Sequence, residues 1–334
     1  MTLNLDLLEK LTQTFGPSGY EDAIRDVIRQ EVAPLVDEVR VDPLGSLVAY
    51  RQGTGGGQKI ALAAHMDEIG VMATYVEEQG YVRFTPIGGG VQPLNAVSNR
   101  VRFANGVTGV IAVERRDDAK SLPGLPHLYI DVGATSREDC PVAVGDPGQF
   151  IGPLVRQGNR LVSKTMDDRV GCYVLVEVLR QLAETGAERP HDVYAIFSTQ
   201  EEITLAGART SAFRIDPDMA ISIDVTGTGD TPKAHPMAVE LGKGPAIKVK
   251  DGGMIAHPLV RDKLVAAAKE AGLPYQMEIL LGGSTDAAAM QLVRAGVPSG
   301  CVSIPCRFIH SPSEMVDEAD VENAITLLVT ALRV

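Results

Sequence analysis

The stretch Lys59-Ile-Ala-Leu-Ala-Ala-His-Met-Asp-Glu68 decides the fold of this chain. Its apolar run follows a glycine-rich turn at residues 53–57 and has the length of a β-strand buried on both faces. Strands of this kind are typical of parallel sheets covered by helices. Polar side chains begin where the run ends, and sites in open α/β sheets gather at that edge. The stretch therefore predicts an α/β fold with a site beyond the end of this strand.

The sequence on both sides of this stretch supports the same fold class. The first 36 residues hold two helical patterns, and Ser18 could cap the second with Glu21 as its partner. Short strands are expected at 38–41 and 46–50. Beyond residue 167 the pattern predicts strands at 191–199, 219–225 and 298–304, and helices at 170–184, 259–271, 285–294 and 317–332. This alternation predicts a mixed, largely parallel sheet with helices on both faces.

Residues 70–160 follow a different pattern. Short alternating stretches are broken by Gly, Pro and Asn, and no helix longer than two turns is expected. This segment therefore predicts a small all-β domain, a barrel or a sandwich, inserted into the α/β domain. The expected domains are residues 1–69 with 161–334, and the insertion 70–160.

Composition excludes several classes of function. The 334 residues include 31 Lys and Arg against 43 Asp and Glu, a net charge of -12, which argues against binding to nucleic acid or to an anionic membrane. The longest apolar runs have only the length of strands, and the N-terminus does not resemble a signal peptide. Four cysteines without CxxC spacing are best explained as reduced thiols. We therefore expect a cytoplasmic protein.

Five segments place histidines or carboxylates at the ends of expected strands or at a helix start. They contain His65 with Asp67, Asp167 with Asp168, Glu201 with Glu202, Asp224, and His310. Most have ordinary explanations when taken singly, because a His-x-Asp pair can be a simple hydrogen bond and consecutive aspartates often cap helices. Glu201 and Glu202 differ, because two carboxylates directly after a buried strand are costly unless a cation pairs with them.

Together the five segments contain the parts of a dinuclear metal site. Two histidines, one aspartate that could bridge and one further carboxylate per metal would hold two cations. One more carboxylate beside them could act as a general base. Two metals placed in this way would clamp a water and polarise a carbonyl, which is hydrolytic chemistry.

At these residues the sequence resembles the TET-type dinuclear metallo-aminopeptidases, which include glutamyl, leucyl and deblocking aminopeptidases. The resemblance covers essentially the whole chain. It is carried by Gly16-Pro-Ser-Gly-Tyr-Glu21, Ala64-His-Met-Asp-Glu-Ile-Gly70, Met166-Asp-Asp-Arg-Val-Gly171, Gln200-Glu-Glu202, Ile223-Asp-Val225, Gly283-Ser-Thr-Asp-Ala287 and Ile309-His-Ser-Pro312. The segment 283–287 has no assigned role, and Ser284 or Thr285 could simply cap a helix there.

The resemblance implies a role for each candidate residue. The implied metal ligands are His65 and Asp224 for one metal, Glu202 and His310 for the other, and Asp167 as the bridge. Glu201 would be the general base, and Asp67 would orient His65. The implied cofactors are two divalent ions, with zinc expected first and cobalt or manganese as alternatives.

The resemblance further implies an enzyme that removes N-terminal amino acids from peptides. The β insertion would serve assembly into a homo-oligomer, a dodecamer in this family. Two alternatives remain open, which are another dinuclear amidohydrolase or deacylase and a non-catalytic assembly protein stabilised by metal. An endoglucanase is disfavoured, because a glycosidase needs two carboxylates free of metal. Arg209, Lys250 and Arg307 are unranked candidates for a pocket that binds an acidic N-terminal side chain.

Overall fold

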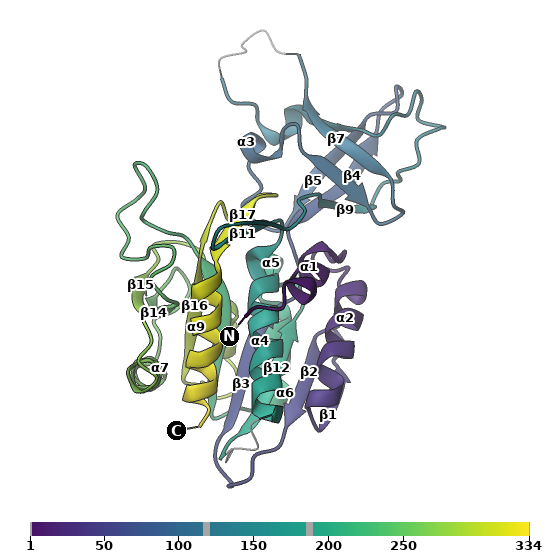
Figure 1. Ribbon diagram of the computed structural model, residues 1–334. Coiled ribbons are helices and arrows are strands. Elements are labelled where there is room, and N and C mark those ends of the chain that lie inside the picture. Colours follow the sequence, from purple (N-terminus) through teal and green to yellow (C-terminus); the bar gives the residue numbers. More distant parts are fainter. Residues whose placement is uncertain (1, 116–120, 185–189, 334) are drawn as a thin grey trace.

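The computed structural model describes residues 2–115, 121–184 and 190–333. Eleven strands in these residues form one sheet, and a separate β-barrel stands at the end of the sheet where α5 (Glu201–Thr204) lies (Figure 1). The sheet order is β1 (Glu38–Val41), β2 (Leu47–Arg51), β12 (Asp192–Ser198), β3 (Lys59–His65), β13 (Met219–Thr226), β16 (Ser299–Arg307), β17 (Glu314–Asp317), β11 (Arg160–Ser163) and β10 (Val155–Gln157). Strand β14 (Ala246–Lys250) pairs with β16, and β15 (Gln276–Ile279) pairs with β14.

Parallel pairing lies mainly at the centre of this sheet. β3 is parallel to both β12 and β13, and β13 is parallel to β16, whereas the β1–β2 and β16–β17 pairs are antiparallel. Strand β3 alternates between two apolar cores, with Leu62 on one face and Ala61 and Ala63 on the other. The expected mixed α/β sheet is therefore confirmed, and β3 is buried on both faces.

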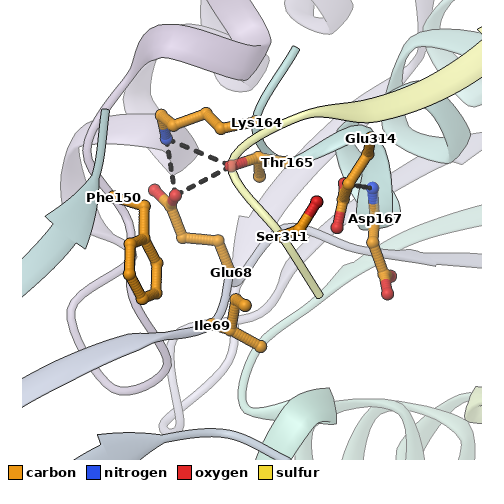
Figure 2. A pocket seen from close by; sticks show the side chains of 8 residues that line it. All are labelled: Glu68, Ile69, Phe150, Lys164, Thr165, Asp167, Ser311 and Glu314. Atoms are coloured by element: carbon orange, nitrogen blue, oxygen red, sulfur yellow. Dashed lines mark hydrogen bonds and ion pairs between the residues drawn. The ribbon is translucent and has the colours of Figure 1, made fainter. Parts of the chain in front are cut away.

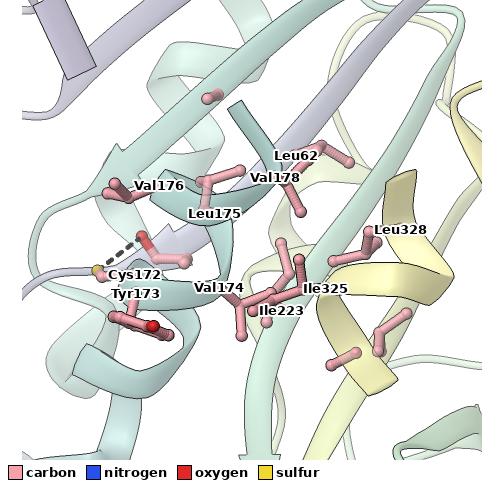
Figure 3. Packing of buried hydrophobic residues seen from close by; sticks show 14 of the residues in the cluster. Leu62, Cys172, Tyr173, Val174, Leu175, Val176, Val178, Ile223, Ile325 and Leu328 are labelled. Carbon is pink, nitrogen blue, oxygen red and sulfur yellow. Dashed lines mark hydrogen bonds between the residues drawn. The ribbon is translucent and has the colours of Figure 1, made fainter. Parts of the chain in front are cut away.

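Helices cover both faces of the sheet. One core contains residues of α1 (Leu5–Gln13), α2 (Asp22–Val32), α4 (Met166–Glu184), α7 (Pro258–Glu270) and α9 (Glu318–Ala331), with η1 (Ala33–Leu35) beside them. The opposite core contains residues of α6 (Ala206–Ile215) and α8 (Asp286–Met290). Figure 3 shows Val174 of α4 beside Ile223 of β13 and Ile325 of α9, and Val178 near Leu62 of β3. This packing holds the start of α4 against the carboxyl end of β3.

The barrel is formed within the segment between β3 and β10. Its strands close in the order β4 (Gly70–Val76), β5 (Val82–Ile87), β8 (Leu128–Asp131), β7 (Thr108–Val113), β6 (Arg100–Phe103) and β9 (Pro147–Phe150). Two short helical segments, α3 (Pro93–Ala96) and η2 (Leu125–His127), connect them. Val71, Val101 and Ile111 belong to its own apolar core. The expected small β-barrel is confirmed, and no helix in the described part of this segment exceeds two turns.

Three local expectations were wrong or incomplete. Ser18 does not cap α2, because its hydroxyl donates to the buried carboxylate of Asp67, and hydrogen bonds to charged acceptors are the stronger ones. The helix expected at 285–294 ends at Met290, since Val293 and Val297 reach the same core from turns. Strands β10, β11, β14, β15 and β17 and helix α6 were not predicted. Among the described residues, no helix is both long and apolar enough to cross a lipid bilayer.

Candidate metal centre

His65 is the last residue of β3 and its side chain is buried. Its Nδ1 lies 3.2 Å from the carbonyl oxygen of Asp67 and 3.6 Å from the Asp67 carboxylate. Its Nε2 lies 3.0 Å from Oδ1 of Asp167. Donation from Nδ1 to Asp67 leaves Nε2 as the atom that can bind a cation, which is the usual arrangement of a histidine ligand.

Asp67 is completely buried and links His65 to the glutamate pair. Its carboxylate accepts hydrogen bonds from the Ser18 hydroxyl and from the backbone N–H groups of Glu201 and Glu202, the latter at 3.0 and 3.2 Å. Burial by itself would raise the pKa of Asp67, but its hydrogen bond and charge interaction with His65 outweigh burial and lower it. Asp67 is therefore bonded to two parts of the candidate site, His65 and the backbone of the glutamate pair.

The consecutive aspartates at the start of α4, Asp167 and Asp168, make different contacts. The Asp167 side chain lies between the two histidines, with Oδ1 3.0 Å from Nε2 of His65 and Oδ2 3.3 Å from Nε2 of His310. Burial would raise the pKa of Asp167, and the two histidines lower it well below its usual range. Asp168 instead accepts from the N–H groups of Gly171 at 3.1 Å and His65 at 3.3 Å. Asp168 is thus the helix cap, and Asp167 is left for the site.

The glutamates follow β12 at a sharp turn. Gln200 has a φ of 56°, in the left-handed region, and its N–H donates to the buried Glu21 carboxylate. This turn directs the carboxylates that follow toward the histidines. Glu202 Oε2 lies 3.4 Å from Nε2 of His310, and Glu201 Oε2 lies 3.9 Å from Nε2 of His65.

The last two candidate residues reach the centre from neighbouring strands. Asp224 lies on β13, which runs parallel to β3 and pairs Ser222 with Ala63. His310 lies between β16 and β17 and has a φ of 61°. Its backbone N–H donates to Glu314 Oε1 at 2.8 Å.

Five of the residues predicted from the sequence form two groups that share one member. The first group is His65, Asp167 and Asp224, and the second is Asp167, Glu202 and His310. Within each group, one possible ligand atom from each residue lies within 4.8 Å of the others. Glu201 belongs to neither group and lies beside the first. Histidine nitrogen with carboxylate oxygen is a donor set that suits zinc, cobalt or manganese.

The buried carboxylates of the centre favour bound cations. Burial raises the pKa of Asp224 and Glu201 well above the usual range, helped by neighbouring carboxylates and opposed by His65. Burial lowers the pKa of His310, but Asp167 and Glu202 raise it to about 11. Glu202 Oε1 is buried and has no hydrogen-bond partner in the part of the chain that the structure describes. Burying this many carboxylates costs several kcal/mol per uncompensated charge, so the residues fit bound divalent ions.

Two further buried carboxylates were not identified from the sequence. Glu314 bridges the site by accepting the Asp167 N–H through Oε2 and the His310 N–H through Oε1, both at 2.8 Å. Asp286, in the segment that had no assigned role, is hydrogen-bonded to the Ser198 hydroxyl at the end of β12. Thr285 occupies the N-cap position of α8, but its hydroxyl pairs with Ser222 and caps nothing. No local pattern marks either carboxylate, because both act through partners far away in the chain.

A second buried polar cluster lies between the centre and the barrel (Figure 2). Glu68 accepts from the Lys164 ammonium at 2.5 Å and from the Thr165 hydroxyl at 2.8 Å. Lys164 also donates to Gln149 of β9, at 3.2 Å. Glu68 and Lys164 are both almost fully buried. This ion pair joins the barrel to the segment that leads from β11 into Asp167.

Comparison with known proteins agrees with the geometry of the site. Residues 45–327 match the family described as M42 glutamyl aminopeptidase. The chain is 47% identical to a putative aminopeptidase of Acetivibrio thermocellus over 98% of both chains. It is 37% identical to the lysyl aminopeptidase of Pyrococcus furiosus, over 96% of this chain and 94% of that protein.

Solved structures show the same fold. The TET1 peptidase of Pyrococcus horikoshii matches with a TM-score of 0.88 and 30% identity over 98% of both chains. It is described as able to assemble into a tetrahedron or a large octahedral shell, and a structure of PhTET1-12s with the same scores is described as a dodecamer.

The family match spans most of the chain, and the proteins of Acetivibrio thermocellus and Pyrococcus furiosus that it resembles are both described as aminopeptidases. Divalent metal ions are part of the chemistry of this metallopeptidase family, and the candidate ligands for them are present. The chain belongs to the M42 family of aminopeptidases, and it is a hydrolase of that kind.

Proposed function

We propose that this aminopeptidase works with two divalent cations, held by His65 and Asp224 on one side, by Glu202 and His310 on the other, and by Asp167 between them. The observation that carries the proposal is the pair of three-residue groups that share Asp167. A shared carboxylate flanked by one histidine and one carboxylate on each side is the donor set of a dinuclear hydrolase.

Bound cations of this kind lower the pKa of water toward neutrality and polarise a carbonyl group. Glu201 is the group placed to move the proton. Its side chain is 10% exposed and its carboxylate stands outside both groups, 3.9 Å from Nε2 of His65, so it is not taken up as a ligand and can accept a proton. Glu201 would accept a proton from the attacking water and pass it to the leaving amine of the peptide.

Replacement of the general base gives the direct test of this proposal. Glu201→Gln preserves the shape of the side chain but cannot accept a proton. We expect the variant to keep both cations, measured by elemental analysis, and to hydrolyse an aminoacyl-anilide roughly 10²–10⁴-fold more slowly. Removal of the metals with EDTA should abolish turnover in the wild type, and zinc or cobalt should restore it. A Glu201→Gln variant with most of its activity would refute the role of Glu201.

The same experiment separates the competing functions. A non-catalytic assembly protein would lose only stability on treatment with EDTA, because it has no turnover to lose. Glu201 argues against that function, since a structural metal site has no use for a base. A glycosidase is disfavoured because three of the candidate carboxylates, Asp167, Glu202 and Asp224, are grouped with histidines as metal ligands would be, whereas a glycosidase uses carboxylates free of metal. Release of an N-terminal amino acid, rather than an acyl group, would distinguish the enzyme from a deacylase.

The substrates we propose are peptides with a free N-terminus. The matched family is described as glutamyl aminopeptidase and one relative as lysyl aminopeptidase, so the N-terminal preference calls for a direct assay. A panel of Leu, Glu, Ala, Lys and Arg anilides, run with zinc, cobalt and manganese in turn, separates acidic, basic and aliphatic preferences and ranks the metals.

We also propose that residues 1–69 and 161–334 form the catalytic unit and that the barrel in 70–160 serves assembly into a homo-oligomer, a dodecamer. The solved TET1 structures, described as a tetrahedron, an octahedral shell and a dodecamer, support this assembly. Gel filtration with light scattering would measure the number of subunits. We also propose a cytoplasmic location, as the composition of the chain suggests.

A further inference from the structure

A loop of three glycines connects the barrel to the metal centre. Gly88, Gly89 and Gly90 follow directly on β5 and lead toward α3. Gly88 and Gly90 have φ values of 86° and 77°, in the region where a side chain is strained, whereas no such value applies to Gly89. The two outer glycines are therefore held in a conformation that only glycine adopts easily.

The same two glycines touch the second half of the metal centre. A Cβ atom on Gly90 would lie 1.7 Å from Nδ1 and 2.6 Å from Cγ of His310. A Cβ atom on Gly88 would lie 3.2 Å from the Cβ of Glu202. A Cβ atom on Gly89 would meet nothing within 4 Å. Gly88 and Gly90, which have a positive φ, are thus closely packed, whereas Gly89, which does not, has open space beside it.

The contact with Gly90 lies on the side of the imidazole away from its proposed ligand atom. Nε2 of His310 points to Asp167 at 3.3 Å and to Glu202 at 3.4 Å. Nδ1 lies against Gly90 and has no hydrogen-bond partner among the described residues, whereas Nδ1 of His65 is bonded to the carbonyl oxygen of Asp67 at 3.2 Å. His310 is also the more exposed histidine, at 28% against 2% for His65. Packing against Gly90 takes the place of the missing hydrogen bond.

The loop can support His310 because both of its ends are anchored. Ile87, which precedes the loop, pairs with Gly70 at the start of β4, only a few residues after His65. Val91, which follows the loop, is buried in the core of the barrel. The buried Glu68–Lys164 pair and its bond to Gln149 keep the barrel in place against the α/β unit (Figure 2). A buried pair of this kind is costly to break, so the loop is not free to drift away from His310.

We propose that Gly90 is a positioning residue of the metal centre, and that its lack of a side chain lets the barrel press the His310 imidazole against Asp167 and Glu202. The barrel then contributes to the catalytic site of its own chain, in addition to any part in assembly. This inference rests on the proposed role of His310 as a ligand.

The test measures the number of bound metal ions, which does not depend on activity. Gly90→Ala should push the imidazole away, and the affinity for the second equivalent of cobalt or zinc should fall about tenfold or more, the scale seen when the support of a ligand is removed. His310→Ala is the reference variant that should lose the second equivalent. Titration followed by the cobalt absorption spectrum, with equilibrium dialysis, reports both equivalents.

Two matched controls separate the clash from general effects. Gly89→Ala adds the same methyl group one residue earlier, where nothing lies within 4 Å. Gly106→Ala, in the turn between β6 and β7, adds it at a φ of 89° with nothing within 4 Å, so it carries the backbone strain without the clash. Both should bind two equivalents with the affinity of the wild type. Two tight equivalents in Gly90→Ala, or an equal loss in Gly106→Ala, would overturn the proposal.

A double variant keeps the test decisive if Gly90→Ala does not fold. Gly90→Ala combined with His310→Ala removes the imidazole that the methyl group would meet. The double variant should fold and melt within a few degrees of His310→Ala, and failure of the double variant to fold would overturn the proposal. Equal metal content in the wild type and in His310→Ala would instead refute the ligand role of His310, and with it the proposed metal arrangement.

Discussion

The two halves of the proposed metal centre are built in different ways. His65 ends a central strand, is 2% exposed and has its Nδ1 held by Asp67, and Asp224 lies on the neighbouring parallel strand. His310 lies in a loop, is 28% exposed, and depends on Glu314 for its backbone and on Gly90 for its ring. The first half follows from the order of strands in the sheet, whereas the second is assembled from segments that meet only after folding.

The difference predicts which half is more easily disturbed. Strand ends within a paired sheet move little, because each is held by neighbouring hydrogen bonds and by two apolar cores. A loop residue with a positive φ depends on its few contacts. We therefore expect the His65 half to tolerate changes around it better than the His310 half.

The largest effect is expected where the two halves meet. Asp167→Ala removes the carboxylate common to both groups, so both cations should be lost and kcat/KM should fall by more than about 10⁴-fold, beyond the loss of a single general base. Elemental analysis and anilide hydrolysis measure the two effects. Asp42→Ala is the control, since Asp42 is a buried carboxylate bonded to Ser211 outside the metal centre, and it should keep both ions. Two tightly bound ions in Asp167→Ala would refute a shared ligand.

An intermediate effect should separate the halves. Glu314→Gln weakens the acceptors for the N–H groups of His310 and Asp167, and we expect one cation, that of the His310 half, to bind about 10–100-fold more weakly. As measured by cobalt titration, the other affinity should fall less, because Asp167 is the only one of its proposed ligands whose backbone N–H Glu314 accepts. The exposed neighbour Ser313→Ala should change neither affinity. An equal loss at both positions would contradict the difference between the halves.

The smallest effect is expected in the support of the first half. Ser18→Ala removes one donor from Asp67 but leaves the two backbone N–H donors, so kcat/KM should fall by less than about tenfold, corresponding to about 1 kcal/mol. Ser211→Ala is a matched control, because it removes a buried hydroxyl bonded to Asp42 outside the metal centre. It should lower the melting temperature and leave kcat/KM unchanged. A larger loss of activity in Ser18→Ala would show that the first half is less robust than we propose.

Several features could be predicted from local pattern. The alternating burial of β3 and the buried strands β12 and β13 follow from runs of apolar residues, so the sheet edge that carries His65, Glu201 and Asp224 could be inferred. The glycines, prolines and short alternating stretches of the barrel could be recognised in the same way. Short strands such as β11 and β17 could not, because four residues with mixed polarity carry no clear period.

The sequence by itself determined the class of fold, the strand ends where polar residues begin, and the kinds of ligand atoms available. These depend on spacing along the chain, and period-two and period-3.6 patterns record them directly. Only the tertiary structure decided that Asp167 faces both histidines while Asp168 caps a helix, that Glu314 supports the centre, and that Gly90 backs His310. Most of those relations join residues far apart in the chain, such as Gly90 and His310, and local periodicity carries no record of which distant side chains will meet.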